Sequence, residues 1–189
     1  MKHYPYRGTL SGFSLIELIF TLSIVSILST TGASSFAHFL KSAQSTTATK
    51  SIVNALQYTR SEAIGRNKVI TLCLSDNGVD CDKTSNRQLI VFHDENNNKT
   101  SEADELIRVI QFDGDRQIFE FRVSAGRNYI RYRPNGSAID FGRIQYCPST
   151  GDARYGSQVV INFSGRPRLA RDNDADGIVN GRNNKNIEC

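Results

Sequence analysis

The sequence predicts an α+β protein in which a long N-terminal α-helix, whose first half spans a membrane, packs on an antiparallel β-sheet or sandwich domain. Two observations lead to this fold class. Residues 13–66 carry apolar residues first in an almost continuous run and then at helical spacing. Residues 67–189 instead contain short alternating segments separated by turn residues. One long helix followed by a run of strands is the α+β arrangement.

The N-terminal helix is expected to have two halves of different polarity. Residues 13–40 are apolar apart from a Ser- and Thr-rich patch, and a helix of this length would extend about 42 Å at ~1.5 Å per residue, enough to cross a bilayer. Residues 41–66 are amphipathic, so this half is expected to pack on the domain. Its apolar residues recur at helical spacing, at Ala48, Ile52, Ala55, Leu56 and Ala63.

Seven strands are expected in the β-rich globular domain, residues 67–189. They are residues 69–74, 88–93, 106–112, 117–123, 128–133, 142–147 and 158–163. Within 117–123 and 128–133 apolar and polar residues alternate cleanly, which predicts one buried and one exposed face for each strand. The C-terminal tail from Asp172 is polar and is expected to be irregular.

Four cysteines follow the apolar segment. An even number of cysteines in an exported domain predicts two disulfides, for which three pairings are possible. The nearest-neighbour pairing, Cys73–Cys81 with Cys147–Cys189, is the simplest of them. A zinc site is the alternative, but the chain has no CxxC motif and no histidine near these cysteines.

Charge is segregated along the globular domain. Residues 73–115 contain ten acidic and four basic residues, a net charge of −6. Residues 116–171 contain ten Arg, no Lys and three acidic residues, a net charge of +7. This distribution predicts an acidic loop on one face and an arginine-rich surface on another.

A single acidic residue, Glu17, interrupts the start of the apolar segment. A lone carboxylate in lipid costs roughly 2.5–3.5 kcal/mol, so a partner is expected. Cleavage after Gly12 would create an amine at Phe13, within one helical turn of Glu17. An ordinary secretory signal cut near Ala33-Ser34-Ser35 and a plain membrane anchor are the alternatives, and neither accounts for Glu17.

The string Gly12-Phe13-Ser14-Leu15-Ile16-Glu17-Leu18 resembles the class III signal of type IV pilins and type II secretion pseudopilins. The resemblance implies that residues 1–12 are a leader removed by a prepilin peptidase, which then methylates the new N-terminal Phe13. It also implies insertion in the bacterial inner membrane with the domain in the periplasm. Residues 13–40 then contact other pilins when the protein is assembled into a pilus at the cell surface.

Several segments resemble the GspH/FimT family of minor pilins and pseudopilins and extend the likeness over most of the chain. They are Arg60-Ser61-Glu62-Ala63, Leu72-Cys73-Leu74-Ser75-Asp76, Val91-Phe92-His93-Asp94, Leu106-Ile107-Arg108 and Ser164-Gly165-Arg166-Pro167-Arg168. His93 and an Asn-rich loop depart from the family pattern without contradicting it. The family implies a type IV pilin-like fold.

The segment Gly165-Arg166-Pro167-Arg168 is the candidate functional site and is expected in a turn after a strand. Pro167 biases Arg166 toward an extended conformation, and two guanidinium forks a short distance apart suit adjacent phosphates. In FimT-like minor pilins of competence systems a GRxR motif binds DNA during natural transformation. The resemblance implies that role for Gly165, Arg166 and Arg168.

Arg154 and Arg171 are expected on the same DNA-binding surface. Binding is expected to be non-specific and to the DNA backbone. The alternatives are a solvated turn and a structural role without DNA binding, as a priming subunit of the pilus tip or a type II secretion pseudopilin.

Metal binding and catalysis are not expected. Two loops contain oxygen ligands at calcium-loop spacing, but Lys99 stands at the turn-glycine position of the first loop and Asn183 at the final Glu position of the second. The loops begin at Asp94 and Asp172. His93 is the only histidine of the globular domain, and no nucleophile motif or phosphate-binding motif is present, so no cofactor and no enzyme activity are predicted.

Overall fold

The computed structural model describes residues 12–112 and 117–189, without the side chains of residues 30–35. The predicted leader, residues 1–12, lies outside the described residues apart from Gly12, and so do the side chains at the centre of the predicted membrane-spanning segment, residues 13–40. The chain divides into two compact units, residues 1–40 and 41–189.

The helix α1 runs from Leu15 to Arg66. In the first unit its large apolar side chains are exposed, for example Phe20, Leu22 and Phe39. Ser23, Ser26 and Ser29 each donate their hydroxyl to the backbone carbonyl oxygen four residues earlier, so these side chains expose little hydrogen-bonding capacity. In the described part of the chain, no helix is long and apolar enough to cross a membrane.

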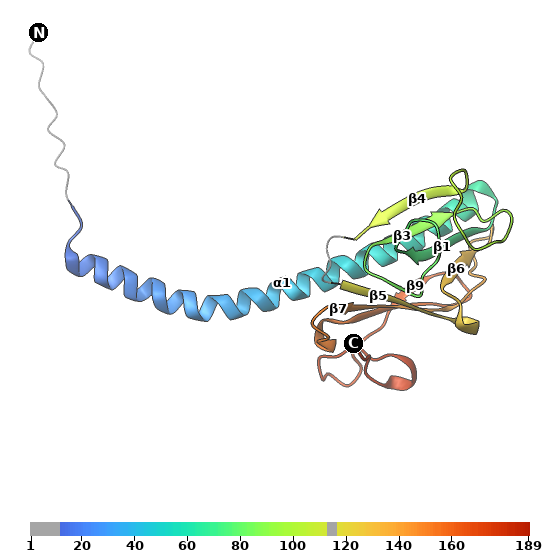
Figure 1. The fold of residues 1–189 in the computed structure, drawn as a ribbon. Coiled ribbons are helices and arrows are strands. Elements are labelled where there is room, and N and C mark those ends of the chain that lie inside the picture. Colours follow the sequence, from blue (N-terminus) through green and yellow to red (C-terminus); the bar gives the residue numbers. More distant parts are fainter. Residues whose placement is uncertain (1–11, 113–116) are drawn as a thin grey trace, which may run out of the picture. The chain divides into compact units, whose positions relative to one another are not determined.

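Two antiparallel sheets form the second unit (Figure 1). The first has the order β4-β3-β1-β6, with β4 Leu106–Gln111, β3 Gln88–Phe92, β1 Ile70–Ser75 and β6 Tyr129–Tyr132. The second has the order β2-β5-β7-β8-β9, with β2 Thr84–Ser85, β5 Gln117–Val123, β7 Gly142–Pro148, β8 Ser157–Ile161 and β9 Pro167–Leu169. The seven predicted strands are present, and the short strands β2 and β9 were not predicted.

The core lies between the sheets and the amphipathic half of α1. All five predicted core residues of this half are buried: Ala48, Ile52, Ala55, Leu56 and Ala63. In β5 the predicted alternation holds, because Phe119 and Phe121 enter the core while Arg122 lies on the outer face of the sheet. The confirmed fold is therefore one helix packed on two antiparallel sheets.

Both disulfides occur in the nearest-neighbour pairing. Cys73 and Cys81 are joined with a Cα–Cα distance of 5.5 Å, and Cys147 and Cys189 with one of 5.4 Å. The second disulfide ties the last residue to β7. Next to it, the Nε2 of Gln145 donates a hydrogen bond of 2.6 Å to the carbonyl oxygen of Glu188. Part of the outer face of the five-stranded sheet is therefore covered by the C-terminal tail, residues 172–189.

Candidate nucleic-acid interface

Gly165 sets the position of the turn between β8 and β9. It is buried and has a φ of +73°, and a Cβ at this position would lie 2.3 Å from the carbonyl oxygen of Gly136. Gly136 belongs to the turn at residues 134–138, between β6 and β7. This turn is also hydrogen-bonded to the β8–β9 turn, since the N–H of Ala138 donates to the carbonyl oxygen of Phe163 at 3.1 Å. Arg60 of α1 donates its Nε–H to the carbonyl oxygen of Gly136 at 2.8 Å. The absence of a side chain at Gly165 thus allows this turn to pack closely against the backbone of Gly136, and Gly165 is too buried to contact a large ligand.

Arg168 lies on a strand, which corrects the expectation that the whole motif forms a turn. Pro167 and Arg168 begin β9, the edge strand, where the missing N–H of proline is tolerated. Pro167 is paired with the buried Ile161 of β8. Proline biases the residue before it toward an extended conformation, in which Arg166 and Arg168 leave the chain on the same side. Both are exposed.

The register of the sheet places three arginines in one line across its outer face. Arg122 of β5 pairs with Arg143 of β7, Arg143 pairs with Val160 of β8, and Val160 pairs with Arg168 of β9. Directly paired residues point to the same face, so Arg122, Arg143 and Arg168 form an arginine row. With strands ~4.8 Å apart, the backbone positions in the row extend over about 14 Å.

The arginine row has few counter-ions. Burial, and then the positive charges of Arg122 and Arg182, lower the pKa of Arg143. Arg122 is paired with Glu120 at 2.8 Å. The side chains of Arg143, Arg168 and Arg182 form no hydrogen bond or ion pair with any other residue that the structure describes. Like charges in directly opposed positions are destabilising, so this surface favours an anion.

A groove of about 1110 Å³ lies over this part of the sheet. Its floor includes Arg122, Arg143 and Val160, and one side is formed by the tail and the segment before it, including Arg171 and Arg182. We call it the basic groove. Among the residues that the structure describes, its charged lining is almost entirely cationic: Lys83, Arg122, Arg127, Arg143, Arg171 and Arg182, with one carboxylate, that of Glu120.

Arg154 is separate from this surface. It lies in the 3₁₀ turn Ala153–Tyr155, before the first residue of β8, whereas Arg166 follows the last. Its guanidinium donates two hydrogen bonds to Asp152, of 3.0 and 2.8 Å, and this pairing lowers the pKa of the Asp152 carboxyl. Of the five residues predicted to bind DNA, Arg168 therefore lies in the arginine row, Arg171 lines the basic groove, and Arg166 is exposed next to β9. Gly165 sets the position of the turn, and Arg154 is paired with Asp152 elsewhere.

The cationic residues that sequence reasoning missed are Lys83, Arg122, Arg127, Arg143 and Arg182. The alternation in residues 117–123 assigns Arg122 to an exposed face. Nothing local indicates that Arg143 is its cross-strand partner or that the tail returns to bring Arg182 beside them.

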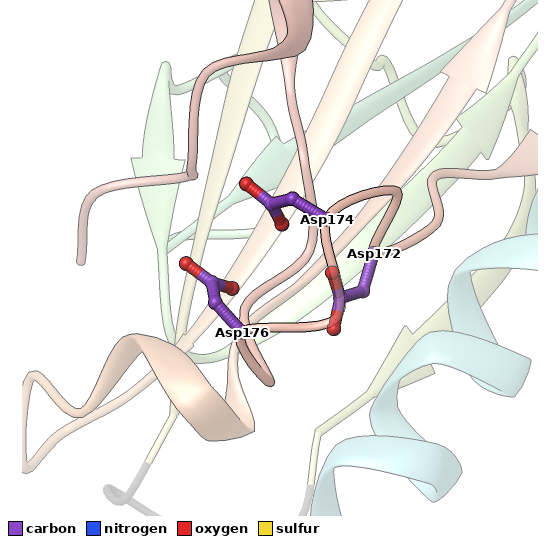
Figure 2. Close-up of side chains that lie close together, drawn as sticks. All are labelled: Asp172, Asp174 and Asp176. Atoms are coloured by element: carbon purple, nitrogen blue, oxygen red, sulfur yellow. The ribbon is translucent and has the colours of Figure 1, made fainter.

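The structure brings together three carboxylates of the tail, Asp172, Asp174 and Asp176, with oxygens within 4.8 Å of one another (Figure 2). Asp172 accepts hydrogen bonds from the N–H groups of Gly177 and Ala175, at 2.9 and 2.7 Å, and these lower its pKa. Oxygen ligands of this kind suit Ca²⁺. All three carboxylates are exposed, however, and exposed acidic groups are common without a metal.

The first calcium-like loop contains a cation of its own. Lys99 has a φ of +67°, the conformation that the turn glycine of a calcium loop adopts. Its Nζ lies 3.0 Å from a carboxylate oxygen of Asp94, the first ligand position of the pattern. The ammonium therefore occupies part of the space in which a calcium ion would be bound.

The predicted processing residues lie at the start of α1. Phe13 is exposed, and Glu17 is in the first helical turn, where a carboxylate interacts favourably with unpaired backbone N–H groups. The N–H of Leu18 donates to the carbonyl oxygen of Ser14 at 3.1 Å. Ser14 and Glu17 also have the spacing of a capping box.

The helix on two antiparallel sheets defines a type IV pilin-like protein. Residues 48–165 match the family described as "Type II transport protein GspH", and since this is more than half of the chain, the protein belongs to that family. A search of curated proteins finds no match.

The similar solved structures include a minor pilin and a minor pseudopilin. The type IV minor pilin FimU of Pseudomonas aeruginosa PAO1 has a TM-score of 0.56 and 19% identity, covering 69% of this chain and 91% of FimU. The minor pseudopilin EpsH of the Vibrio cholerae type 2 secretion system has a TM-score of 0.48 and 14% identity, covering 67% of this chain and 95% of EpsH. The predicted family and fold are confirmed: the chain is a minor pilin or pseudopilin, a structural protein and not an enzyme.

Proposed function

We propose that this minor pilin binds DNA non-specifically through its arginine-rich surface and captures it for uptake in natural transformation. The observation that carries the proposal is the arginine row, continued by Arg166 and by the basic groove. Arg143 and Arg168 form no ion pair with any residue that the structure describes, and guanidinium groups of this kind on a sheet face suit a chain of phosphates. The registers of β7, β8 and β9 place Arg143 and Arg168 two strands apart on the same face.

The N-terminal unit supports the assembly part of the proposal. Its large apolar side chains are exposed over residues 13–40, and contiguous exposed apolar surface of this kind marks an interaction site with lipid or protein. We propose that prepilin peptidase cleaves after Gly12, that the new Phe13 amine pairs with Glu17, and that this segment is held in the inner membrane and later by neighbouring pilins.

Duplex binding by the full-length protein in detergent, measured by fluorescence anisotropy over a range of salt, tests the DNA proposal. Affinity should fall steeply with salt, vary little with sequence and lie in the ~10⁻⁴–10⁻⁶ M range of non-specific binding. Arg166→Ala and Arg168→Ala should each weaken binding and reduce the salt slope by about 0.9, the loss of one phosphate contact. Their unfolding temperatures should remain those of the parent, because both side chains are exposed.

Two control variants make the test specific. Arg108→Ala removes one positive charge from β4 of the other sheet and should leave DNA affinity almost unchanged. Arg154→Ala should also have little effect, since Asp152 already neutralises this guanidinium. If a folded Arg166→Ala/Arg168→Ala double variant binds duplex DNA as the parent does, the site assignment is wrong. Loss of piliation on deletion, without DNA binding, would instead indicate a purely structural subunit of the pilus tip or secretion system.

A further inference from the structure

We infer that the basic groove binds an unpaired, single-stranded segment of nucleic acid, with a base stacked on Phe163. This inference rests on the proposed DNA-binding function and deepens it, because it distinguishes the groove from the Arg166–Arg168 edge that contacts duplex phosphates. It follows from the juxtaposition of two features in one concave site: guanidinium groups without counter-ions and exposed aromatic rings.

The aromatic rings of Phe141 and Phe163 line the groove. They lie with centroids 4.4 Å apart and planes inclined by 49°, and 41% of Phe141 and 62% of Phe163 are exposed. Phe163 is in the turn between β8 and β9, where its backbone carbonyl is already bound to the N–H of Ala138. The domain therefore holds the turn in place while leaving a large apolar surface in water, which favours an apolar partner.

The charges beside these rings identify the partner as an anion. Arg143 and Arg182 line the groove, and neither forms an ion pair with a residue in the described part of the chain. Their mutual repulsion contributes to the lowered pKa of Arg143. An uncharged apolar ligand would leave this repulsion in place, and an inorganic anion would leave the rings exposed. A polyanion that carries flat aromatic groups satisfies both.

Single-stranded nucleic acid has this chemistry and duplex DNA does not. In a duplex the base faces are stacked inside and only phosphates and sugars face a protein outside the grooves, whereas an unpaired base offers its face to an aromatic side chain. The groove volume of about 1110 Å³ exceeds the roughly 300–1,000 Å³ of most small-molecule pockets, so the groove suits a segment of a chain better than a small molecule.

The test compares the full-length protein in detergent with a labelled single-stranded dT₁₂ and a blunt hairpin duplex at one salt concentration. Phe163→Leu should weaken dT₁₂ binding by roughly fivefold or more, the loss of one base–aromatic stack, and change duplex binding by less than about twofold. Leu169→Ala is the matched control, because this exposed apolar residue is paired with the buried Val159 and so lies on the opposite face of the same sheet. It should leave both affinities unchanged.

A spectroscopic readout reports stacking directly. The chain contains no tryptophan, so Phe163→Trp introduces a single indole at this position. Its fluorescence should be quenched by dT₁₂ and remain unchanged with inorganic polyphosphate, an anionic chain without bases. Phe163→Trp should also retain dT₁₂ affinity where Phe163→Leu loses it.

The outcomes separate the two proposals. If the Phe163→Leu variant binds dT₁₂ as tightly as the parent does, the single-strand inference is overturned. The same holds if the substitution lowers the affinities for dT₁₂ and for the duplex equally. In both cases duplex binding by the parent still supports the proposed function. If the parent binds neither nucleic acid, both fail. Quenching of the introduced indole by polyphosphate alone would also overturn the inference, because charge rather than stacking would then be responsible.

Discussion

Substituting Gly165 by alanine is the sharpest test of how the domain positions its arginines. The new Cβ would lie 2.3 Å from the carbonyl oxygen of Gly136 and 3.2 Å from the amide nitrogen of Ala138, both backbone atoms. Neither can move aside by a rotamer change. The φ of +73° adds the usual penalty for a side chain in the left-handed region.

The magnitude follows from the two costs. The left-handed backbone costs alanine about 1–2 kcal/mol, and overpacking against fixed atoms typically costs about 1–3 kcal/mol. Gly165→Ala should therefore reduce the free energy of unfolding by roughly 2–5 kcal/mol. Gly126 is the matched control, since it has a φ of +69° but nothing within 4 Å of a new Cβ. Gly126→Ala should cost only the first ~1–2 kcal/mol.

Urea unfolding followed by circular dichroism measures both variants on the same scale. The difference between them, about 1–3 kcal/mol, is the part due to contact with the 134–138 turn. Equal destabilisation of the two variants would show that the turn does not hold Gly165. The account of how Arg166 and Arg168 are placed would then have to be abandoned.

Three further predictions concern other parts of the chain. Glu17→Ala should be cleaved normally yet be absent from sheared pili, because the Phe13 amine would lack its counter-ion; normal incorporation contradicts the pairing. Cys189→Ser should release the tail from β7, which should raise amide hydrogen exchange in residues 178–188 and weaken dT₁₂ binding. Unchanged hydrogen exchange would show that other contacts hold the tail. The pKa of Asp172 is lower in the folded protein than in the unfolded chain. The hydrogen bonds that Asp172 accepts from the amides of Ala175 and Gly177 are therefore fully formed above the ordinary pKa of about 3.9, and they are lost as the pH falls through the lowered folded value. The Gly177 amide shift, followed by NMR, should report this loss, and Asp172→Asn should remove the titration.

Much of the fold could be predicted because its signals are local. The apolar period of residues 41–66 identified the buried face of α1, and the alternation in residues 117–123 identified the inner face of β5. The strands that were missed, β2 and β9, have two and three residues, too few to show a period. β9 also begins with proline, which in a sequence indicates a turn unless the strand is known to lie at the edge of a sheet.

The sequence by itself determined the fold class, the candidate motif, the nearest-neighbour disulfide pairing as the simplest arrangement, and the presence of an arginine-rich surface. Only the tertiary structure decided which arginines share that surface. Arg122, Arg143 and Arg168 come together through the registers of β5, β7, β8 and β9, and register depends on pairing between segments far apart in the chain. Arg154, although close in sequence, is separated from them because it precedes β8 and pairs with Asp152. Residues that are close in the sequence follow the chain, whereas residues that share a sheet face follow the strand register. The two agree here for Arg168 and Arg171 but not for Arg154.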